Sequence, residues 1–423
     1  MFGLRQVSAL VLTSVLSASA FAAGYEKNIL WSGRHAGVGG TSAAWASGGE
    51  ALVFNPAGLA TEQGKREVVG NISIISSQYK APVVTDNSSM SSARKNSIVP
   101  AVFYGANPTE KLGYGIGLYA SGGTTVEYKG IDLSTLGNSN RPDLKTELTA
   151  IEASVGAGYK VMPGLKVGAA YRFGIIEAEL SSLTPIGGAN VVQGSIQDIK
   201  GTQHGFRTGV QWAPEGKNYG LGLVYRSPLH FEASGDLSAN LLSASASTPL
   251  TTSGRSTIKT IMPAQFNFGG YYNIVPDVWR AHAEYVWTQY SRNQTLDIGG
   301  TVTLPGPATV QVADINQRWR DQHNIRIGGE YLKCKYPIRF GYIWNSGVEN
   351  PSFARSIFAA PGKANSFTLG TGRSTDKWDF NVATEYTVAK ADNAVVTTSA
   401  LTARSGKYTT SAVSLHTGVV YKF

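Results

Sequence analysis

Apolar and polar residues alternate with period two along much of the chain, most clearly between residues 277 and 287. One face of this segment carries Trp279, Ala281, Ala283, Tyr285 and Trp287, and the other carries Arg280, His282 and Glu284. The two tryptophans would lie about 27 Å apart along a strand. On a strand tilted by ~40° they span roughly 20 Å, close to the apolar band of ~25 Å between the aromatic girdles of a membrane barrel. The pattern therefore predicts a membrane-crossing strand with its aromatic face toward lipid.

The same alternation recurs in several other segments, including the last one of the chain. Clear examples are 206–212, 219–226, 336–344, 378–386 and 412–423. Short turn signals such as Pro214-Glu215-Gly216 separate some of the segments. Long stretches rich in Ser, Thr, Gly and Asn, among them 181–202 and 238–257, separate others and are expected to be loops. Short periplasmic turns and long extracellular loops alternate in this way in outer-membrane barrels.

We predict an all-β membrane protein in which residues 65–423 form a 14-stranded antiparallel transmembrane β-barrel. The barrel must close, because an open edge in lipid would leave backbone N–H and C=O groups without partners. With an even number of strands, the first strand begins and the last strand ends on the same, periplasmic side of the membrane. The predicted strands lie near 66–80, 96–107, 111–122, 147–161, 165–180, 203–213, 218–235, 258–274, 278–296, 322–333, 336–346, 364–374, 377–390 and 406–423.

The N-terminus, residues 1–23, has the three parts of a secretory signal peptide. Arg5 supplies the positive charge, Val7–Leu16 is apolar, and Ala20-Phe21-Ala22 matches a cleavage site. The apolar run is too short to cross a bilayer as a helix, which needs ~20 residues. We therefore expect an exported protein, placed either in the periplasm or in the outer membrane of a bacterium.

Composition favours the outer membrane over a soluble periplasmic protein. Charged residues make up 15% of the chain, below the ~25% of ordinary soluble domains. The formal net charge of +9 is not gathered into a basic run, so we expect no nucleic-acid partner. A single cysteine, Cys334, cannot form an intramolecular disulfide, and we expect it to be a passive residue.

Residues 24–64 do not read as strands. They are rich in Gly and Ala and contain Asn55-Pro56-Ala57, which favours a turn because the residue before proline leaves helical geometry. From the residues alone, this segment is either a periplasmic extension or a plug that folds into the lumen.

These residues resemble the N-terminal hatch of the FadL/TodX family of outer-membrane transporters for hydrophobic compounds. Later segments are similar to the family too, namely Tyr225-Arg226-Ser227-Pro228, Met262-Pro263-Ala264 and Trp319-Arg320-Asp321. The resemblance implies a monomeric barrel that is plugged by its own N-terminal domain, residues 24–64. It also implies that long-chain fatty acids or related molecules are caught in an extracellular groove and pass to a pocket near the hatch. They would then leave sideways into outer-membrane lipid, through the wall at a kinked third strand.

Several residues could serve this route. The glycine-rich third strand offers Gly117, Gly122 and Gly123 for the wall opening, since glycine weakens pairing and permits bulges. An Arg would best bind a carboxylate. The candidates are the lumen-facing Arg207, Arg226, Arg280, Arg326 and Arg339, together with Arg318 and Arg320. Most of the lumen-facing arginines could instead form a structural ladder paired with Glu284, Glu330, Asp379 and Glu385. Apolar loop residues that could form the outer groove are Leu133, Leu136, Leu241 and Leu242.

One departure from the family favours a different substrate. The fifth strand reads Glu177-Ala178-Glu179 where the family places a ligand-facing basic residue, so neutral hydrocarbons or monoaromatics are alternatives to fatty acids. A general porin-like barrel and a surface adhesin are further alternatives. An enzyme is disfavoured because none of the six histidines lies in a nucleophile or metal-binding motif. We expect no catalytic residue, no metal and no cofactor.

Overall fold

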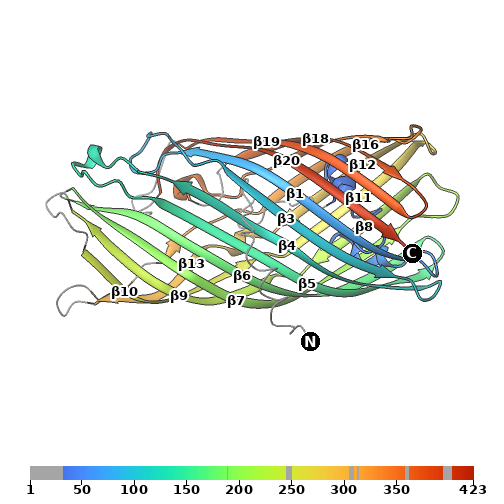
Figure 1. Cartoon of the computed structure of the whole chain (residues 1–423), viewed down its shortest axis with the longest axis horizontal. Helices are drawn as coiled ribbons and strands as arrows, with labels where there is room; N and C mark the ends of the chain where they lie inside the picture. The colour runs from blue at the N-terminus through green and yellow to red at the C-terminus, as the bar shows by residue number, and fades with distance from the viewer. Residues whose placement is uncertain are drawn as a thin grey trace, which may run out of the picture.

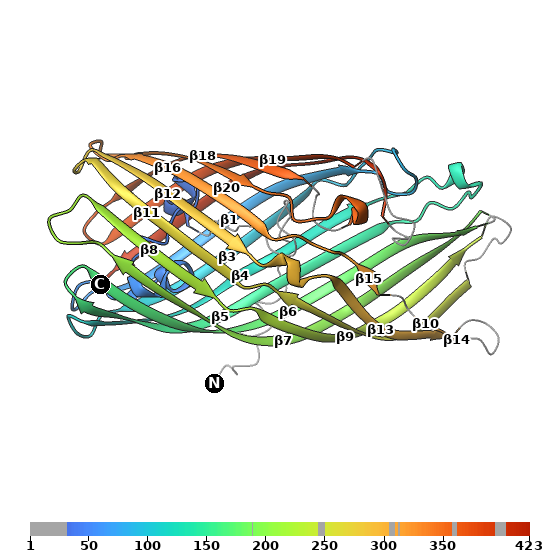
Figure 2. The same cartoon turned by 180° about the vertical axis from the view of Figure 1, so that it is seen from behind.

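The computed structural model describes residues 32–187, 189–243, 250–303, 309–311, 314–357, 362–393 and 403–423. The predicted signal peptide, residues 1–23, lies outside these. The described chain forms a closed antiparallel barrel with 14 strand positions in its wall (Figures 1 and 2). Closure is direct, because Gly70 of the first strand pairs with Val102 on one side and with Val419 of the last strand on the other.

The wall strands follow chain order, and some positions hold more than one segment. They are β1 (Arg66–Ala81), β3 (Lys95–Ala106), β4 (Leu112–Tyr128), β5 (Leu144–Met162), β6 (Leu165–Gly187), β7 (Asn190–Trp212), β8 (Tyr219–Arg226) with β9 (Leu229–Leu242), β10 (Leu250–Met262) with β11 (Gln265–Val275), β12 (Trp279–Thr288) with β13 (Thr295–Thr303), β14 (Thr309–Gln311) and β15 (Ile315–Asn316) with β16 (Gln322–Tyr331), β17 (Ile338–Asn345), β18 (Lys363–Ser374), β19 (Trp378–Asn393) and β20 (Gly406–Lys422). A short β2 (Met90–Ser91) pairs with the end of β1.

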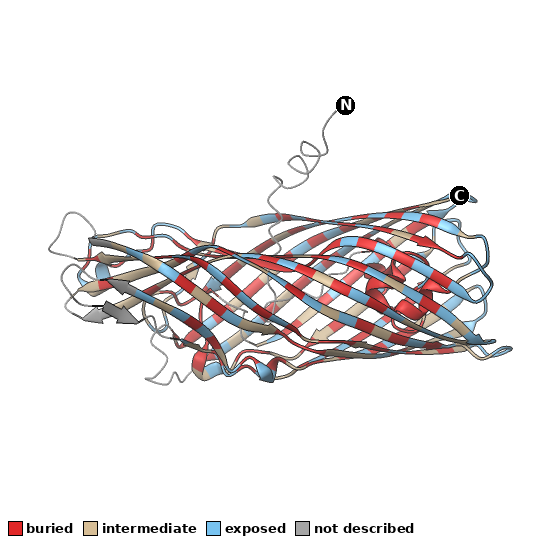
Figure 3. Cartoon of the chain, turned by 90° about the horizontal axis from the view of Figure 1, so that it is seen from below, coloured by how far each residue is buried: buried red, intermediate tan, exposed pale blue. Residues whose placement is uncertain are grey.

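Near the end with the short turns, the outward face of the wall is apolar and the inward face is polar, as the alternation predicts. On β12, Trp279 and Tyr285 point outward and are about two-fifths exposed, whereas His282 and Glu284 point inward and are buried. Figure 3 shows the same alternation of buried and exposed residues along the strands. The outward aromatic face, and with it the predicted membrane-crossing arrangement, is confirmed.

Toward the other end the alternation reverses, and here the prediction of loops at 181–202 and 238–257 was wrong in part. Strands β6, β7, β9 and β10 continue well into these stretches (Figure 1). Their inward residues are apolar and buried, as at Leu183 and Ile196, while outward residues are charged, as at Glu232 and Lys259. The outward Ser, Thr and Gly residues of these extensions look like loop sequence, although the inward positions keep a strand period.

Three neighbouring wall positions are interrupted at a similar height. Ser227-Pro228 separates β8 from β9, and Pro263-Ala264 separates β10 from β11. Proline lacks the N–H that a ladder needs, so it interrupts a central strand. Residues 289–294, with the short 3-10 helix η3 (Tyr290–Arg292), separate β12 from β13.

The segment before the barrel, residues 32–65, lies inside the lumen at the end where the C-terminus lies (Figure 1). We refer to it as the lumenal segment. It contains α2 (Gly33–Gly37), α3 (Ala51–Phe54) and the 3-10 helix η1 (Pro56–Leu59). The Ser32 hydroxyl accepts from the Arg34 N–H at the start of α2, and the side-chain Oδ1 of Asn55 accepts from the Ala57 N–H at the start of η1. Among the described residues, no helix is long and apolar enough to cross a membrane.

Candidate functional site

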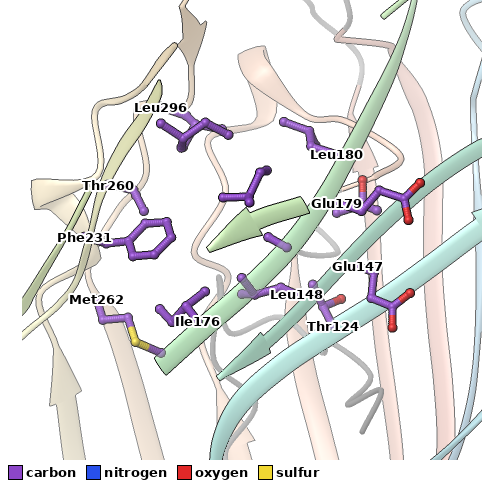
Figure 4. Close-up of a pocket in the computed structure, with 14 residues that line it drawn as sticks. Thr124, Glu147, Leu148, Ile176, Glu179, Leu180, Phe231, Thr260, Met262 and Leu296 are labelled. Atoms are coloured by element: carbon purple, nitrogen blue, oxygen red, sulfur yellow. The ribbon is translucent and has the colours of Figure 1, made fainter. Parts of the chain in front are cut away.

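A mostly apolar cavity occupies the lumen in the half of the barrel away from the lumenal segment (Figure 4). Phe231, Met262 and Leu296 line one side and face Ile176 and Leu180 on the other. Such a cavity, apolar inside a barrel whose outer surface at this height is charged, suits an apolar guest.

The apolar loop residues predicted for an outer groove continue this lining. Leu133, beside the 3-10 helix η2 (Ser134–Leu136), is fully buried in the same hydrophobic cluster as Leu242. Leu136 packs against that cluster, and Leu241 is half-buried. The Asn138 amide donates to the Leu242 carbonyl at 3.0 Å, which holds the two segments together. The structure thus brings Leu133 and Leu242 together, and their role in ligand binding stays a prediction.

Below the cavity lies a cluster of arginines that encloses a single carboxylate. Arg172 contacts Glu152 through two hydrogen bonds, Nε to Oε2 at 2.8 Å and Nη2 to Oε1 at 2.6 Å. Arg207 and Arg226 are directly paired on the neighbouring strands, and both are buried. The Tyr119 hydroxyl donates to the same carboxylate at 2.9 Å. Three guanidinium groups around one carboxylate leave an excess of positive charge in a buried place.

This arginine cluster connects the cavity to the lumenal segment. The Arg226 guanidinium donates to the Pro263 carbonyl at 3.3 Å, next to Met262 of the cavity wall. On the opposite side, Arg207 donates to the Leu52 carbonyl of the lumenal segment at 3.1 Å. A molecule at the bottom of the cavity would therefore meet cationic hydrogen-bond donors before it meets the lumenal segment.

Our sequence reasoning placed Arg207 and Arg226 on the lumen face but missed Arg172 and Glu152. The sequence pattern around Arg172 could have predicted that its side chain points inward. Its neighbours Tyr171 and Phe173 are aromatic and point outward, so a residue between them must point inward.

The acidic residues of the fifth strand do not oppose an anion in the lumen. Glu177 and Glu179 occupy outward positions of β6, where Glu177 pairs with Lys200 and Glu179 pairs with Lys145 at 2.7 Å. Glu179 reaches only the rim of the cavity, with its carboxyl group on the far side from Phe231 (Figure 4). The departure noted in the sequence therefore does not place negative charge beside a bound carboxylate.

The predicted arginine ligands lie in two different places. Arg318 and Arg320 are exposed, and the Arg318 guanidinium lies 5.3 Å from the ring centre of Phe353. Arg326 is buried and donates to the Gly40 carbonyl of the lumenal segment at 2.8 Å and to Glu284 at 3.4 Å. The structure thus separates Arg326 from the other two, and ligand binding by any of the three stays a prediction.

The glycine-rich third strand, β4, is irregular where the sequence suggested an opening. A register shift against β5 lies between Ala120 and Gly122. Pairing between β3 and β4 stops at Ala101↔Tyr119, next to Pro100. Among the described residues, the upper parts of these two strands share no ladder. Just before β3 begins, the chain meets β4 again, where the Ala93 N–H donates to the Glu127 carbonyl at 2.8 Å. Gly122 and Gly123 thus border a gap in the ladder, whereas Gly117 lies below it, facing Phe103 and Leu52.

The lumenal segment is held against the wall by buried carboxylates and by close backbone contact. One Glu284 oxygen accepts from the Ser42 and Ala43 N–H groups at 2.7 and 2.8 Å, and Glu67 accepts from the Gly49 N–H at 2.8 Å. A Cβ at Gly168 would lie 2.2 Å from the Pro56 carbonyl carbon. Glycine is needed there because the backbones approach too closely for any side chain.

The Asn55-Pro56-Ala57 motif lies at the centre of this contact. Besides capping η1, the Asn55 amide donates to the Ala43 carbonyl at 2.6 Å and to the Val210 carbonyl of β7 at 3.0 Å. Asn55 thus joins two turns of the lumenal segment to the wall.

The predicted lumenal ladder of charges is confirmed for most of its members. The observed ion pairs are Arg339–Glu330 at 2.8 Å, Arg326–Glu284 at 3.4 Å and Arg280–Glu330 at 3.8 Å.

Within the described ranges, no cluster of three or more His, Cys, Asp or Glu side chains could hold a metal ion.

Comparisons with known proteins agree with this architecture. Residues 10–423 match the family model described as outer membrane protein transport protein (OMPP1/FadL/TodX). Among curated proteins, none matches the chain.

Solved structures match over nearly the whole chain. A Pseudomonas aeruginosa FadL homologue superposes with a TM-score of 0.76 at 15% identity, covering 94% of this chain and 99% of that one. The Pseudomonas putida toluene transporter TodX superposes with 0.74 at 17% identity, covering 97% and 99%. The Ralstonia pickettii toluene transporter TbuX superposes with 0.70 at 20% identity, covering 93% and 98%. At these identities the likeness establishes the fold. Together with the family match, it shows that the chain belongs to the OMPP1/FadL/TodX family of outer membrane transport proteins and is a multi-pass β-barrel of the bacterial outer membrane.

Proposed function

We propose that the protein is an uptake channel for hydrophobic compounds and that long-chain fatty acids are its substrates. The observation that carries this proposal is the reversal of polarity along the wall. In a water-filled pore the lumen would be polar throughout, but here the lumen becomes apolar where the outer surface becomes charged. An apolar lumen gains free energy by taking an apolar molecule out of water.

The route begins at the loops and continues downward. Leu133, Leu136, Leu241 and Leu242 form the outer groove, and the apolar cavity lies beneath it. At the bottom, the carboxylate of a fatty acid reaches the cluster of Arg172, Arg207 and Arg226. Arginine presents several donors in a fixed fork that matches a carboxylate. Excess positive charge in a buried place makes an anionic guest favourable there.

Release is lateral, through the wall between β3 and β4. The missing ladder above Ala101↔Tyr119 and the register shift at Gly122 support this exit. Thr124 of β4 lines the cavity, so the gap in the ladder and the cavity share one strand. A lateral exit delivers an apolar molecule to outer-membrane lipid and avoids a second passage through water.

The lumenal segment makes up most of a hatch that keeps the lower lumen closed. The domain boundaries that follow from this proposal are a signal peptide at 1–23, a hatch at 24–64 and the barrel at 65–423. The barrel works as a monomer, because ligand path, hatch and exit all lie within one chain. Arg318 and Arg320 would attract anionic amphiphiles at the exposed loops.

The proposal is tested by uptake of radiolabelled oleate and toluene into cells that express Arg226→Gln. We expect oleate affinity to fall roughly tenfold, because a charge-assisted hydrogen bond is lost, and toluene uptake to stay unchanged. The matched control is Arg373→Gln, which removes an exposed cation near a periplasmic turn. Equal oleate uptake by Arg226→Gln and wild type would exclude carboxylate binding at this cluster.

A second candidate substrate class is neutral hydrocarbons or monoaromatics. The observation that favours it is that no cationic side chain lines the cavity among the described residues. Two of the similar structures are named as toluene transporters. Toluene uptake without oleate uptake, together with neutral hydrocarbons in the mass spectrum of copurified molecules, would favour this class.

A further inference from the structure

A second interruption of the wall lies between β10 and β13, on a different side from the gap at β3 and β4. The ladder that joins β10 to β13 ends at Lys259↔Asp297, and the ladder that joins β11 to β12 begins at Gln265↔Thr288. Among the described residues, no ladder joins the two sides between these points. The intervening residues on one side are 289–294, which contain η3.

Three separate hydrogen bonds, two of them from a side chain, join the two sides of this interruption in place of a ladder. The Asn293 amide donates to the Ile261 carbonyl at 2.8 Å and to the Thr260 hydroxyl at 3.2 Å. The Gln289 N–H donates to the Ala264 carbonyl at 3.0 Å. Asn293 is 2% exposed, yet its Oδ1 atom has no hydrogen-bond partner among the residues that the structure describes. Buried acceptors of this kind are rare in folded proteins and call for an explanation.

The apolar cavity reaches this place from the inside, and a polar depression reaches it from the outside. Phe231 and Thr260 line both hollows. Figure 4 shows these two side chains next to each other at the edge of the cavity. The outer depression is also lined by His230, Lys259 and Asn293. The wall is therefore thin here, and Asn293 lies in it.

The interruption lies at the height where the outer surface changes from apolar to charged. Directly below it, outward-facing rings form a continuous row, with ring centres 5.7 Å apart for Phe206–Tyr225, 4.8 Å for Tyr225–Phe266 and 5.4 Å for Phe266–Trp287. Directly above it, Lys259 pairs with Glu232 at 3.1 Å. Aromatic rows mark the border between hydrocarbon and headgroups. The interruption therefore lies at the outer membrane interface.

We propose that this interruption is a side portal through which alkyl-chain or aryl amphiphiles at the outer membrane interface enter the cavity. Asn293 is its latch, since displacement of one amide group removes both of its hydrogen bonds across the gap. Apolar molecules partition out of water into the interface, so a mouth at this height receives them where they are concentrated. This portal serves entry and rests on the proposed function in hydrophobic uptake.

Opening of the portal can be measured independently of transport. In a Cys334→Ser background, Leu296→Cys places a thiol on the cavity wall, and N-phenylmaleimide dissolved in proteoliposome membranes labels it. We expect Asn293→Ala to raise the labelling rate roughly three- to tenfold, because the bonds that close the gap are lost. Thr387→Ala removes a buried hydroxyl from the continuous β18–β19 ladder and should leave the rate unchanged.

If Asn293→Ala does not assemble, Thr260→Val removes one of the two acceptors. Equal labelling rates in the latch variant and the control would overturn the portal.

Transport through the portal is tested by a disulfide lock. Thr260→Cys with Asn293→Cys, in the same background, should slow oleate uptake several-fold until dithiothreitol is added. The control pair Ser366→Cys with Thr387→Cys joins two strands that already share a ladder, and it should have no effect. Uptake by the locked protein at the unlocked rate would refute entry through the portal. If the unlocked protein takes up neither oleate nor toluene, the proposed function is wrong, and the labelling experiment alone decides whether the portal opens.

Discussion

The two halves of this barrel use one wall in opposite ways. In the half that holds the lumenal segment, outward residues such as Ile325 and Phe340 are apolar and about half exposed, and the inward residues carry buried charges. In the other half, inward residues such as Leu183 and Ile196 are apolar, and outward residues carry ion pairs such as Arg255–Asp236. Several strands, among them β5 and β6, run through both halves.

The difference shows that the solvent outside and the filling inside decide which face of a strand is apolar. Lipid surrounds the lower half, and a folded segment fills its lumen with backbone groups that need polar partners, as Ser42 and Ala43 do. Water surrounds the upper half, and its lumen is lined by apolar side chains. The proposed uptake of hydrophobic compounds depends on the same contrast, because the apolar cavity of the upper half lies above a lower half that the lumenal segment fills with polar contacts.

Removal of the lumenal segment should have the largest effect on this contrast. Deletion of residues 32–60 would leave the buried charges of the lower lumen, among them Glu284 and Arg339, facing an open space that water fills. We expect the closed barrel to become an ion-conducting pore, while the upper chamber keeps its apolar lining. Conductance in planar bilayers measures this, with the full-length barrel as control. A deletion variant that stays non-conducting would show that the segment is not the plug.

A charge placed on the outer face should destabilise the barrel more when it lies in the lower half than when it lies in the upper half. Ile325→Arg places a cation on the apolar face and should destabilise the barrel by about 2–4 kcal/mol if this position lies near the bilayer centre. Ser253→Arg places the same cation on the outward face of the upper half and should change stability by less than about 0.5 kcal/mol. Urea unfolding in lipid vesicles measures both. Similar values for the two variants would contradict a border between lipid and water along this wall.

The sequence predicted the lower half much better than the upper half. Alternation with an aromatic face, as in Trp279 to Trp287, follows directly from lipid outside and polar contacts inside. In the upper half, the outward residues of 190–200 and 238–242 are small or polar, so a loop and a solvated strand look alike. The arginine cluster was only partly predictable, because the pairing of Arg207 with Arg226 depends on strand register. Register is set by turns and partners, which one strand's sequence does not contain.

The stability of the folded lumenal segment inside the barrel should depend on pH, because the segment contains a titratable residue. Burial raises the pKa of Glu50 from 4.5 to about 7, and its contact with the Asn71 amide at 3.4 Å offsets this only in part. Because the folded state keeps the proton longer than the unfolded state, stability should fall as pH rises from about 4.5 to about 7 and change little above that. A pKa difference of this size changes the free energy of unfolding by at most about 3 kcal/mol.

Glu50→Gln should abolish this pH dependence and make the lumenal segment more stable at pH 8 than in wild type. Protection of its backbone amides in hydrogen exchange, measured at pH 5 and pH 8, provides the readout. A wild-type segment that is better protected at pH 8 than at pH 5 would show that the sign is wrong.

The smallest effect should come from exchanging one buried carboxyl in each half for its amide. Glu284 in the lower half accepts from two backbone N–H groups and from the Asn267 amide, and it pairs with Arg326, so Glu284→Gln removes a charge that four donors share. We expect a loss of about 2 kcal/mol in the seating of the lumenal segment. Glu349 in the upper half is buried, which raises its pKa well above 4.5 and favours its protonated form, and it accepts from the Arg355 N–H at 3.0 Å. Because an amide has nearly the shape of a protonated carboxyl group, Glu349→Gln should cost less than about 0.5 kcal/mol. Hydrogen exchange measures both, and a larger loss from Glu349→Gln than from Glu284→Gln would mean that the upper half also depends on a buried negative charge.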